Sequence, residues 1–191
     1  MKNHKLLIVY FSMTGESYVG GKLVDLKVGN TDRACQMAAD LTGAERLEIK
    51  TVKIYPAGHM NLIAEAKKEL SAHARPALNM DSVNMDLYDT VILGYPNWWG
   101  TIPMPVASFL ASNDFTGKTI LPLCTNEGSG MGNSEKDIQR LCPLAELRSG
   151  LSLIGGQVAS AQPQIEQWLE QNEIIKGEEK HGTDNDCIEQ R

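Results

Sequence analysis

The chain has 191 residues, and its 18 Lys and Arg against 24 Asp and Glu give a formal net charge of −6 at pH 7. A negative chain repels nucleic-acid phosphates, so this charge disfavours a nucleic-acid partner. The length fits one domain, and the apolar runs are too short for a membrane span or a signal peptide, so we expect a cytoplasmic protein with no membrane partner.

The first element is a continuous apolar run over residues 5–11, which predicts a central parallel strand covered on both faces. A turn rich in hydroxyl groups follows it. Such a turn at the carboxyl end of a strand can hold a phosphate, although ordinary turns use the same residue types. The turn has neither Gly-Lys-Ser/Thr nor Gly-x-Gly-x-x-Gly, which favours a lone phosphomonoester over a nucleotide triphosphate or NAD. Its candidate residues are Ser12, Met13, Thr14, Gly15, Glu16 and Ser17.

Residues 18–30 alternate apolar and polar side chains around a Gly-Gly pair, which predicts a small hairpin-like insertion. Thr31 and Asp32 are then expected to cap a helix that ends at Gly43. If the insertion folds back, Asn30 and Thr31 return to the phosphate and the helix dipole adds to its binding.

The remainder of the chain alternates between predicted strands and predicted helices. This order predicts an α/β domain with a five-stranded parallel, doubly wound sheet, helices on both faces and a ligand at the carboxyl ends of the strands. We place the domain at residues 1–175 and expect a polar tail over residues 176–191. The expected strands are residues 44–52, 90–95, 119–124 and 151–158, and the expected helices are residues 60–74, 105–111, 133–142 and 162–171.

Two more loops leave the carboxyl ends of predicted strands that should neighbour the first one. One carries Pro96, Asn97, Trp98, Trp99 and Gly100, and the other runs from Thr125 through Asn126, Glu127, Gly128, Ser129 and Gly130 to Gly132. Adjacent tryptophans between Pro and Gly could fill the core, but both cannot easily point inward, which favours stacking on a ligand. A ligand with a phosphate at one end and a flat polar heterocycle at the other fits all three loops. FMN has this shape.

The remaining candidate residues are expected to be structural. His59 and His73 are expected at the surface, and Cys124 in the core. The four cysteines, which include Cys35, Cys142 and Cys187, lack metal-binding and disulfide spacing, so we expect reduced thiols and no metal site.

Residues 9–17, 94–105 and 125–132 resemble the flavodoxin family, in particular its bacterial branch with a Trp-Trp-Gly loop. The resemblance extends from about residue 5 to residue 169. It implies a flavodoxin-like sheet of order 2-1-3-4-5 and one noncovalent FMN. The phosphate would lie among residues 12–17, the isoalloxazine against Trp98 or Trp99, and the pyrimidine end of the ring beside residues 125–132. It places Gly100 at the N5 edge, where a peptide can rotate on reduction.

The resulting hypothesis is an electron carrier that shuttles low-potential electrons between a flavin reductase and an acceptor protein, with no catalytic acid or base of its own. The alternative is an FMN-dependent NAD(P)H quinone or nitro reductase on the same fold, which an open flavin face would permit. Basic residues near the three loops are scarce, which disfavours this alternative. A module that has lost its flavin is a third possibility, and the intact loops argue against it.

Overall fold

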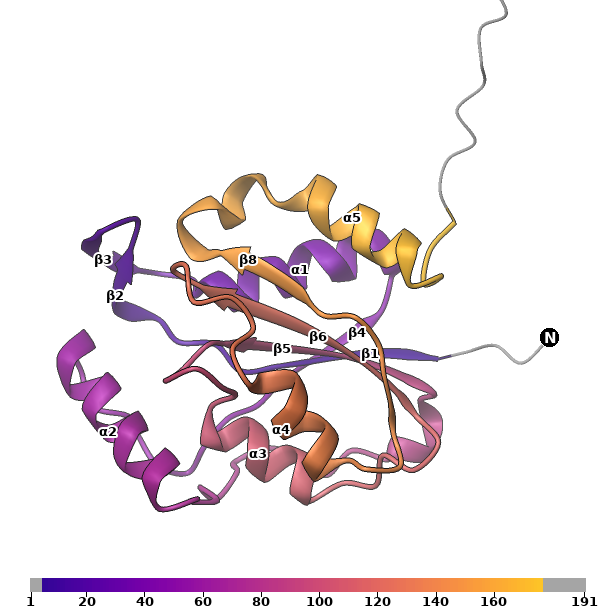
Figure 1. Cartoon of the computed structure of the whole chain (residues 1–191), viewed down its shortest axis with the longest axis horizontal. Helices are drawn as coiled ribbons and strands as arrows, with labels where there is room; N and C mark the ends of the chain where they lie inside the picture. Colours follow the sequence, from indigo (N-terminus) through magenta and orange to yellow (C-terminus); the bar gives the residue numbers. More distant parts are fainter. Residues whose placement is uncertain (1–4, 177–191) are drawn as a thin grey trace, which may run out of the picture.

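The computed structural model describes residues 5–176. Cys187 and the predicted tail, apart from its first residue, lie outside this range. The elements in chain order, shown in Figure 1, are β1 (Leu6–Tyr10), β2 (Gly15–Val19), β3 (Lys22–Leu26), α1 (Asn30–Thr42), β4 (Glu45–Glu48), α2 (His59–Ser71), η1 (Met85–Leu87), β5 (Thr90–Pro96), α3 (Met104–Ala111), β6 (Thr119–Asn126), α4 (Ser134–Leu141), β7 (Glu146–Leu147), β8 (Leu151–Ile154), η2 (Gly155–Ser160) and α5 (Gln162–Gln171).

The main sheet is parallel and has the predicted order. β4, β1, β5 and β6 are neighbours in that sequence, and β7 and β8 both pair with the far side of β6. β1, β5 and β6 are buried along most of their length because helices cover both faces. The doubly wound α/β fold predicted from the sequence is confirmed.

The fifth position of the sheet is divided between two short strands. Thr119 of β6 pairs with Glu146, whereas Leu123 pairs with Leu151, so one extra residue lies between β7 and β8. An extra residue of this kind is a β-bulge and interrupts the ladder. β6 ends at Asn126, opposite Ile154, so the chain has no partner strand beyond Ile154 and continues as η2. The predicted strand over residues 151–158 is therefore too long.

The second predicted strand, residues 44–52, is also too long. β4 ends at Glu48 because its partner β1 ends at Tyr10, directly opposite. One further bond, from the N–H of Ile49 to the carbonyl of Tyr10 at 2.7 Å, completes the pairing. The chain then leaves the sheet, and Thr51 forms an antiparallel bridge with Leu78.

Helices cover the two faces of the sheet in separate layers. α1 and α5 lie over one face, and α3 and α4 lie over the other (Figure 1). Each layer encloses its own cluster of buried side chains, one around Ile8, Ile92 and Ile165 and the other around Val9, Leu93 and Phe109. Within residues 5–176, no helix has the length and apolar character needed to cross a membrane.

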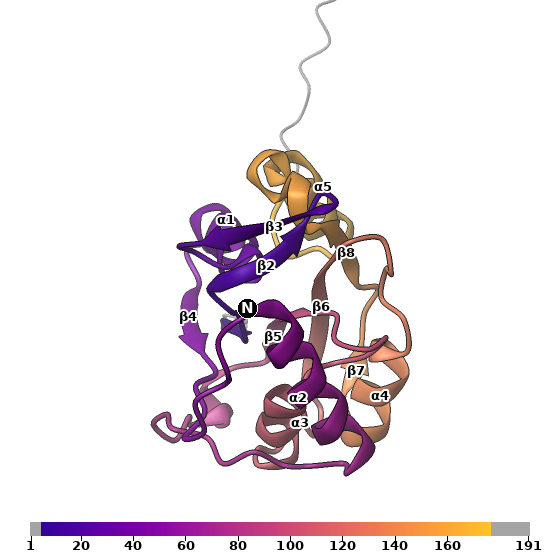
Figure 2. The same ribbon diagram turned by 90° about the vertical axis from the view of Figure 1, so that its left-hand side faces the viewer.

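Two elements lie beyond the carboxyl ends of the strands instead of on a face. The hairpin β2–β3 and helix α2 face the viewer in Figure 2, which looks at this end of the sheet. The predicted insertion is confirmed as an antiparallel hairpin, but it begins at Gly15 and not at residue 18. Gly15, Glu16 and Ser17, predicted as part of the phosphate loop, therefore belong to a strand of the hairpin.

Candidate ligand-binding site

A cavity of about 360 Å³ opens at the carboxyl ends of β1, β5 and β6. Ligand sites in doubly wound sheets occur at this place. Its walls come from the three predicted loops, the hairpin, the start of α1 and one side of α2. The lining residues are Ser12, Met13, Ser17, Tyr18, Val19, Leu26, Asn30, Thr31, His59, Leu62, Ile63, Ala66, Pro96, Asn97, Trp98, Trp99, Thr125, Asn126, Glu127, Ser129 and Gly155.

The hairpin returns the chain to the loop after β1. Gly29 lies against that loop so closely that a Cβ would stand 2.1 Å from Ser12 Oγ and 2.4 Å from the carbonyl oxygen of Met13. Only glycine permits this approach. The expected return of Asn30 to the first loop is thus present in the structure, and the hairpin does not separate the start of α1 from that loop.

The start of α1 offers donors to the cavity. The helix begins at Asn30 with Gly29 at the N-cap, so the predicted capping role of Thr31 and Asp32 is wrong. Ser12 Oγ, from the loop after β1, accepts a bond from the N–H of Asp32 at 3.1 Å and caps the helix instead. The N–H groups of Asn30 and Thr31 precede the helical ladder and lie at the positive end of the dipole, where anions bind.

Two buried hydroxyls lie near this end of the cavity. Thr31 Oγ1 and Thr125 Oγ1 are 2.7 Å apart and hydrogen-bonded, which joins α1 to the end of β6. One hydroxyl donates to the other, so the second proton remains available to a different acceptor. Both residues line the cavity. The pair can therefore donate one bond to a ligand.

The Trp-Trp-Gly segment forms a tight two-residue turn. Trp98 and Thr101 exchange backbone hydrogen bonds of 3.0 and 3.2 Å, and the residues between them have positive φ, 55° at Trp99 and 80° at Gly100. This is the pattern of a type I′ turn. Gly100 adopts its conformation without a Cβ clash, whereas the left-handed region is unfavourable for a residue as large as Trp99. Backbone strain of this kind is often found at functional sites.

The two tryptophans point in different directions, and both line the cavity. Trp98 packs edge-on against Phe11 and Tyr55, with ring centroids 5.3 and 5.6 Å away, and is partly buried against the core. Trp99 is 48% exposed and lies across α2, where its Nε1 donates to the carbonyl of Ile63 at 2.8 Å. The two adjacent side chains do not both enter the core, as the sequence indicated.

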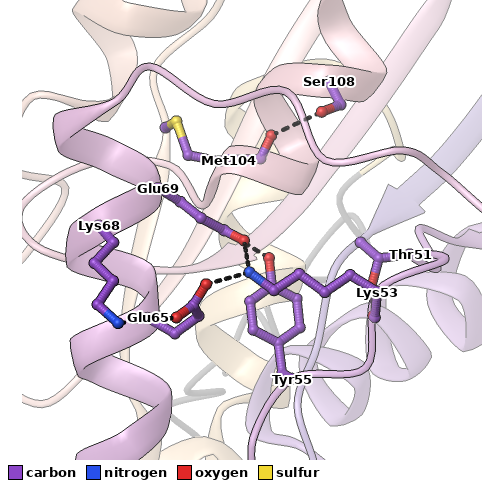
Figure 3. Close-up of polar contacts among 8 residues, drawn as sticks. All are labelled: Thr51, Lys53, Tyr55, Glu65, Lys68, Glu69, Met104 and Ser108. Carbon is purple, nitrogen blue, oxygen red and sulfur yellow. Dashed lines mark hydrogen bonds and ion pairs between the residues drawn. The ribbon is translucent and has the colours of Figure 1, made fainter.

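A partly buried ionic cluster beneath α2, shown in Figure 3, holds Tyr55. Tyr55 in turn packs against Trp98. Glu69 is 5% exposed and accepts bonds from Tyr55 Oη at 2.8 Å and from Lys53 Nζ at 2.7 Å. Lys53 also pairs with Glu65. Burial, followed by the bond to Glu69, raises the pKa of Tyr55, so its hydroxyl remains a donor.

Two of the asparagines at the cavity, Asn97 and Asn126, shape the loop after β6. Asn97 Oδ1 accepts the N–H of Gly100 and its Nδ2 donates to the carbonyl of Gly130, both at 2.8 Å. Asn126 Oδ1 accepts the N–H groups of Gly128 and Gly130, both at 2.9 Å. Gly128 and Gly130 do not line the cavity; they give the loop the curvature that these bonds hold.

The same loop packs directly on the tryptophan turn. A Cβ on Gly132 would lie 2.3 Å from the carbonyl oxygen of Gly100, and the N–H of Asn133 donates to that oxygen at 2.7 Å. Both peptide groups of Gly100 are therefore hydrogen-bonded within the protein. Gly100 does not line the cavity, so its predicted place at the flavin edge has no support in this geometry.

Two carboxylates hold the walls together. Glu127 Oε2 accepts the N–H of Gly20 at the hairpin tip at 2.9 Å, and Oε1 accepts the N–H of Gly156 at 3.0 Å. Glu16, on the hairpin, accepts the N–H of His59 at 2.8 Å and places its charge at the start of α2. The N-terminus of α2 is thus compensated by Glu16, whereas that of α1 faces the cavity.

Most of the residues predicted from the sequence are brought together around the cavity. Those that line it are Ser12, Met13, Ser17, Asn30, Thr31, Pro96, Asn97, Trp98, Trp99, Thr125, Asn126, Glu127 and Ser129. Those that do not line it are Thr14, Gly15, Glu16, Gly100, Gly128, Gly130 and Gly132. Thr14 is exposed, Gly15 and Glu16 belong to β2, and the other glycines shape the two loops.

The sequence interpretation missed the outer walls. They consist of Tyr18, Val19 and Leu26 on the hairpin, His59, Leu62, Ile63 and Ala66 on α2, and Gly155. His59, expected at the surface, is partly exposed and also lines the cavity, where its ring stacks with Tyr18 at 6.1 Å between centroids. The alternating apolar residues of the hairpin could have indicated these walls, because the apolar side of an isolated hairpin must pack against another part of the protein.

The hydrogen-bond donors of the lining are mainly uncharged. Among the described residues around the cavity there is no Lys or Arg, and Glu127 is the one carboxylate. Across residues 5–176, no group of three or more His, Cys, Asp or Glu side chains could hold a metal ion. The arrangement can hold a flat ligand whose anionic end meets hydroxyl, amide and backbone N–H groups.

Comparisons with known proteins identify the family and the fold. The family model described as Flavodoxin matches residues 5–172. The fold is similar to a Bacteroides uniformis protein described as a flavoprotein, with TM-score 0.72, 29% identity and coverage of 88% of this chain and 99% of that chain. A Bacteroides eggerthii protein, also described as a flavoprotein, has TM-score 0.71 and 27% identity, with coverage of 88% of this chain and 97% of that chain. A Lactobacillus acidophilus flavoprotein solved in complex with FMN has TM-score 0.59 and 16% identity, with coverage of 82% of this chain and 97% of that chain. This similarity is one of fold alone. No curated protein matches significantly.

Proposed function

Because this chain belongs to the flavodoxin family, we propose that its cavity binds one FMN noncovalently and that the loaded protein carries electrons between redox proteins. The observation that carries the proposal is the cavity itself, with an open helix N-terminus at one end and two tryptophans at the other. The similar L. acidophilus flavoprotein, solved with FMN, supports the choice of flavin.

The donor set fits a phosphomonoester. The phosphate would be held by the backbone N–H groups of Asn30 and Thr31 and by neighbouring hydroxyls, with no lysine or arginine among the described lining residues. Ser12 shapes this end because its hydroxyl caps α1. In the described part of the chain, three helix starts reach the cavity, but those of α2 and η2 bond to Glu16 and Glu127. The start of α1 is left for one phosphate, which favours FMN over a dinucleotide.

The other end of the cavity fits a flat ring. Trp98 and Trp99 offer aromatic surface from the loop after β5, and Leu62 and Ile63 offer aliphatic surface from α2. Loops rich in glycine allow the backbone to approach a ring closely. When bound, FMN would supply the redox chemistry, and the protein would orient it and set its electrostatics.

The charge of the cavity lining determines whether binding raises or lowers the reduction potential of a redox ligand. A lining with one carboxylate and no lysine or arginine among the described residues disfavours additional negative charge on the ligand. Reduction that adds such charge is therefore less favourable. This supports a low reduction potential and a role as an electron donor to protein partners.

One observation favours a second function. The loop after β6 contributes no aromatic residue, and Trp99 is 48% exposed, so a second flat molecule could approach the ring. This would suit an NAD(P)H quinone or nitro reductase. The lack of a lysine or arginine among the described lining residues weighs against it, since nicotinamide nucleotides carry phosphates.

The first experiment identifies the ligand. The purified protein should show the visible absorption of a flavin, either directly or after incubation with FMN, and chromatography after heat release should identify that flavin as FMN. Recovery of FAD would overturn the choice of cofactor. An absence of flavin after reconstitution would overturn the proposal.

The second experiment separates carrier from reductase. FMN-loaded protein is mixed anaerobically with NADH or NADPH, with and without an added flavin reductase. A carrier should be bleached only when the reductase is present. Rapid bleaching without it would establish the second function.

A further inference from the structure

The hairpin β2–β3 is not part of the main sheet, and its support comes from a few contacts. Its strands pair only with each other among the described residues, and an isolated two-stranded hairpin is marginally stable in water. Its outer strand is exposed over Lys22–Asp25. Something other than its own pairing must therefore keep it in place.

The hairpin nevertheless forms one wall of the cavity. Ser17, Tyr18, Val19 and Leu26 line it, and these residues come from both strands. In Figure 2 the hairpin extends from the loop after β1 at its base toward the region of β8 at its tip. If the hairpin moved outward, the cavity would open on this side.

The contacts that hold the hairpin are at its base and at its tip. Near the base, Glu16 accepts the N–H of His59, and farther along the same strand Tyr18 stacks on the ring of His59. At the tip, Glu127 accepts the N–H of Gly20 with one oxygen and the N–H of Gly156 with the other. Hydrogen bonds to a charged carboxylate are stronger than neutral ones. Glu127, in the loop after β6, thus joins the tip of the hairpin to the start of η2.

From this geometry we infer that the hairpin is a retaining arm over the bound ligand and that Glu127 is its clasp. The inference rests on the proposed function for the identity of the ligand, FMN, and adds a positioning residue that controls how fast the ligand enters and leaves. Glu127 acts through the hairpin and not through a bond to the ligand. Loss of the clasp therefore frees both the entry and the exit of the ligand.

Three variants test the clasp. Glu127→Ala removes both acceptor oxygens, and Glu127→Gln keeps one of them. The matched control is Glu135→Ala, because Glu135 Oε1 accepts the N–H of a glycine, Gly150, at 3.0 Å but lies outside the cavity lining. All three variants and the parent are measured by rapid mixing with FMN and by displacement of bound FMN, followed by flavin fluorescence.

Glu127→Ala should release FMN about tenfold faster than the parent, which corresponds to about 1.4 kcal/mol. Glu127→Gln should lie between them, and Glu135→Ala should match the parent. The association rate of Glu127→Ala should also rise, because an arm that opens more often admits the ligand more often. A faster release with an unchanged association rate would instead show a lost direct contact and overturn the inference. A release rate equal to that of the parent would also overturn it.

A second measurement does not depend on flavin. Amide hydrogen exchange in the ligand-free protein should be about tenfold faster at residues 16–26 in Glu127→Ala, with unchanged exchange in β1. Equal protection of the hairpin in parent and variant would overturn the clasp. If the parent bound no FMN, the proposed function would fail, and this measurement would still decide whether Glu127 holds the hairpin.

Discussion

Trp99 occupies a backbone position that asparagine fills more easily. With φ of 55° it is the first central residue of a type I′ turn, and Gly100 is the second. Asn-Gly is a strongly preferred pair for such turns. We predict that Trp99→Asn leaves the free energy of unfolding of the ligand-free protein nearly unchanged and weakens FMN binding.

The near-zero effect on stability comes from opposing contributions. Relief of left-handed strain stabilises the variant by roughly 1–2 kcal/mol. Against this, the variant loses the indole bond to Ile63, worth about 1 kcal/mol, and the contact with Lys67, whose Nζ lies 4.8 Å from the ring centroid and contributes roughly 0.5–1 kcal/mol. The net change should stay within ~1 kcal/mol, a shift in melting temperature of about 2–4 °C.

The effect on binding should be larger. Loss of the aromatic surface removes stacking worth roughly 0.5–1.5 kcal/mol in addition to the apolar contact area. The Kd for FMN should therefore rise by about tenfold, measured by quenching of flavin fluorescence. Leu144→Asn, at a side chain that is 67% exposed and outside the cavity lining, is the control and should change neither quantity.

Two results would refute this reasoning. An unchanged Kd would show that Trp99 does not contact the ligand, and its strained conformation would then need another explanation. A loss of more than about 3 kcal/mol in the ligand-free protein would show that the indole supports the fold, because that exceeds the sum of its two polar contacts.

Three other changes test the packing of the site and the core. Gly29→Ala places a Cβ 2.1 Å from Ser12 Oγ, so we expect a loss of about 2 kcal/mol in urea unfolding and weaker FMN binding; full stability would contradict the close approach. Gly132 has φ of 57°, and a Cβ there would lie 2.3 Å from the carbonyl oxygen of Gly100, so Gly132→Ala should lower the free energy of unfolding by at least as much. A variant with both the melting temperature and the FMN affinity of the wild type would contradict this prediction. Burial raises the pKa of Tyr10 to about 12, above an unfolded value of about 10. The unfolded chain therefore releases this proton first, and the stability that Tyr10 contributes below pH 10 is lost as the pH rises toward 12. Urea midpoints should fall over this range, and less steeply in Tyr10→Phe; parallel curves would refute the assignment.

The central strands could be predicted because their burial is visible in the sequence. β5 and β6 lie under helices on both faces, and their apolar runs show it. The lengths of β4 and β8 could not be predicted in the same way. Each ends where its neighbour ends, β4 opposite Tyr10 and β8 opposite Asn126, and nothing in its own residues indicates that point.

The inner half of the candidate site could be predicted for a topological reason. Polar or aromatic residues that follow parallel strands meet at one edge of the sheet, which identifies Ser12, Trp98 and Asn126 without knowledge of distances. The outer half depends on contacts between distant segments. His59 lines the cavity because Glu16 fixes the first turn of α2, and no local pattern predicts a bond across 43 residues.

The inserted hairpin changes how ligand binding depends on the fold. In a loop that runs directly into a helix, one continuous segment would form the phosphate end. Here Ser12 and Asn30 are brought together by the close approach of Gly29 after an excursion through the whole hairpin. A ligand that enters while the hairpin is open is held by both segments only once the hairpin has closed, so the free energy of closing the hairpin is part of the binding free energy. By linkage, the ligand must then stabilise the closed hairpin by the same amount that closure strengthens binding. Variants that loosen the hairpin should therefore weaken FMN binding even when every residue that touches the ligand is intact.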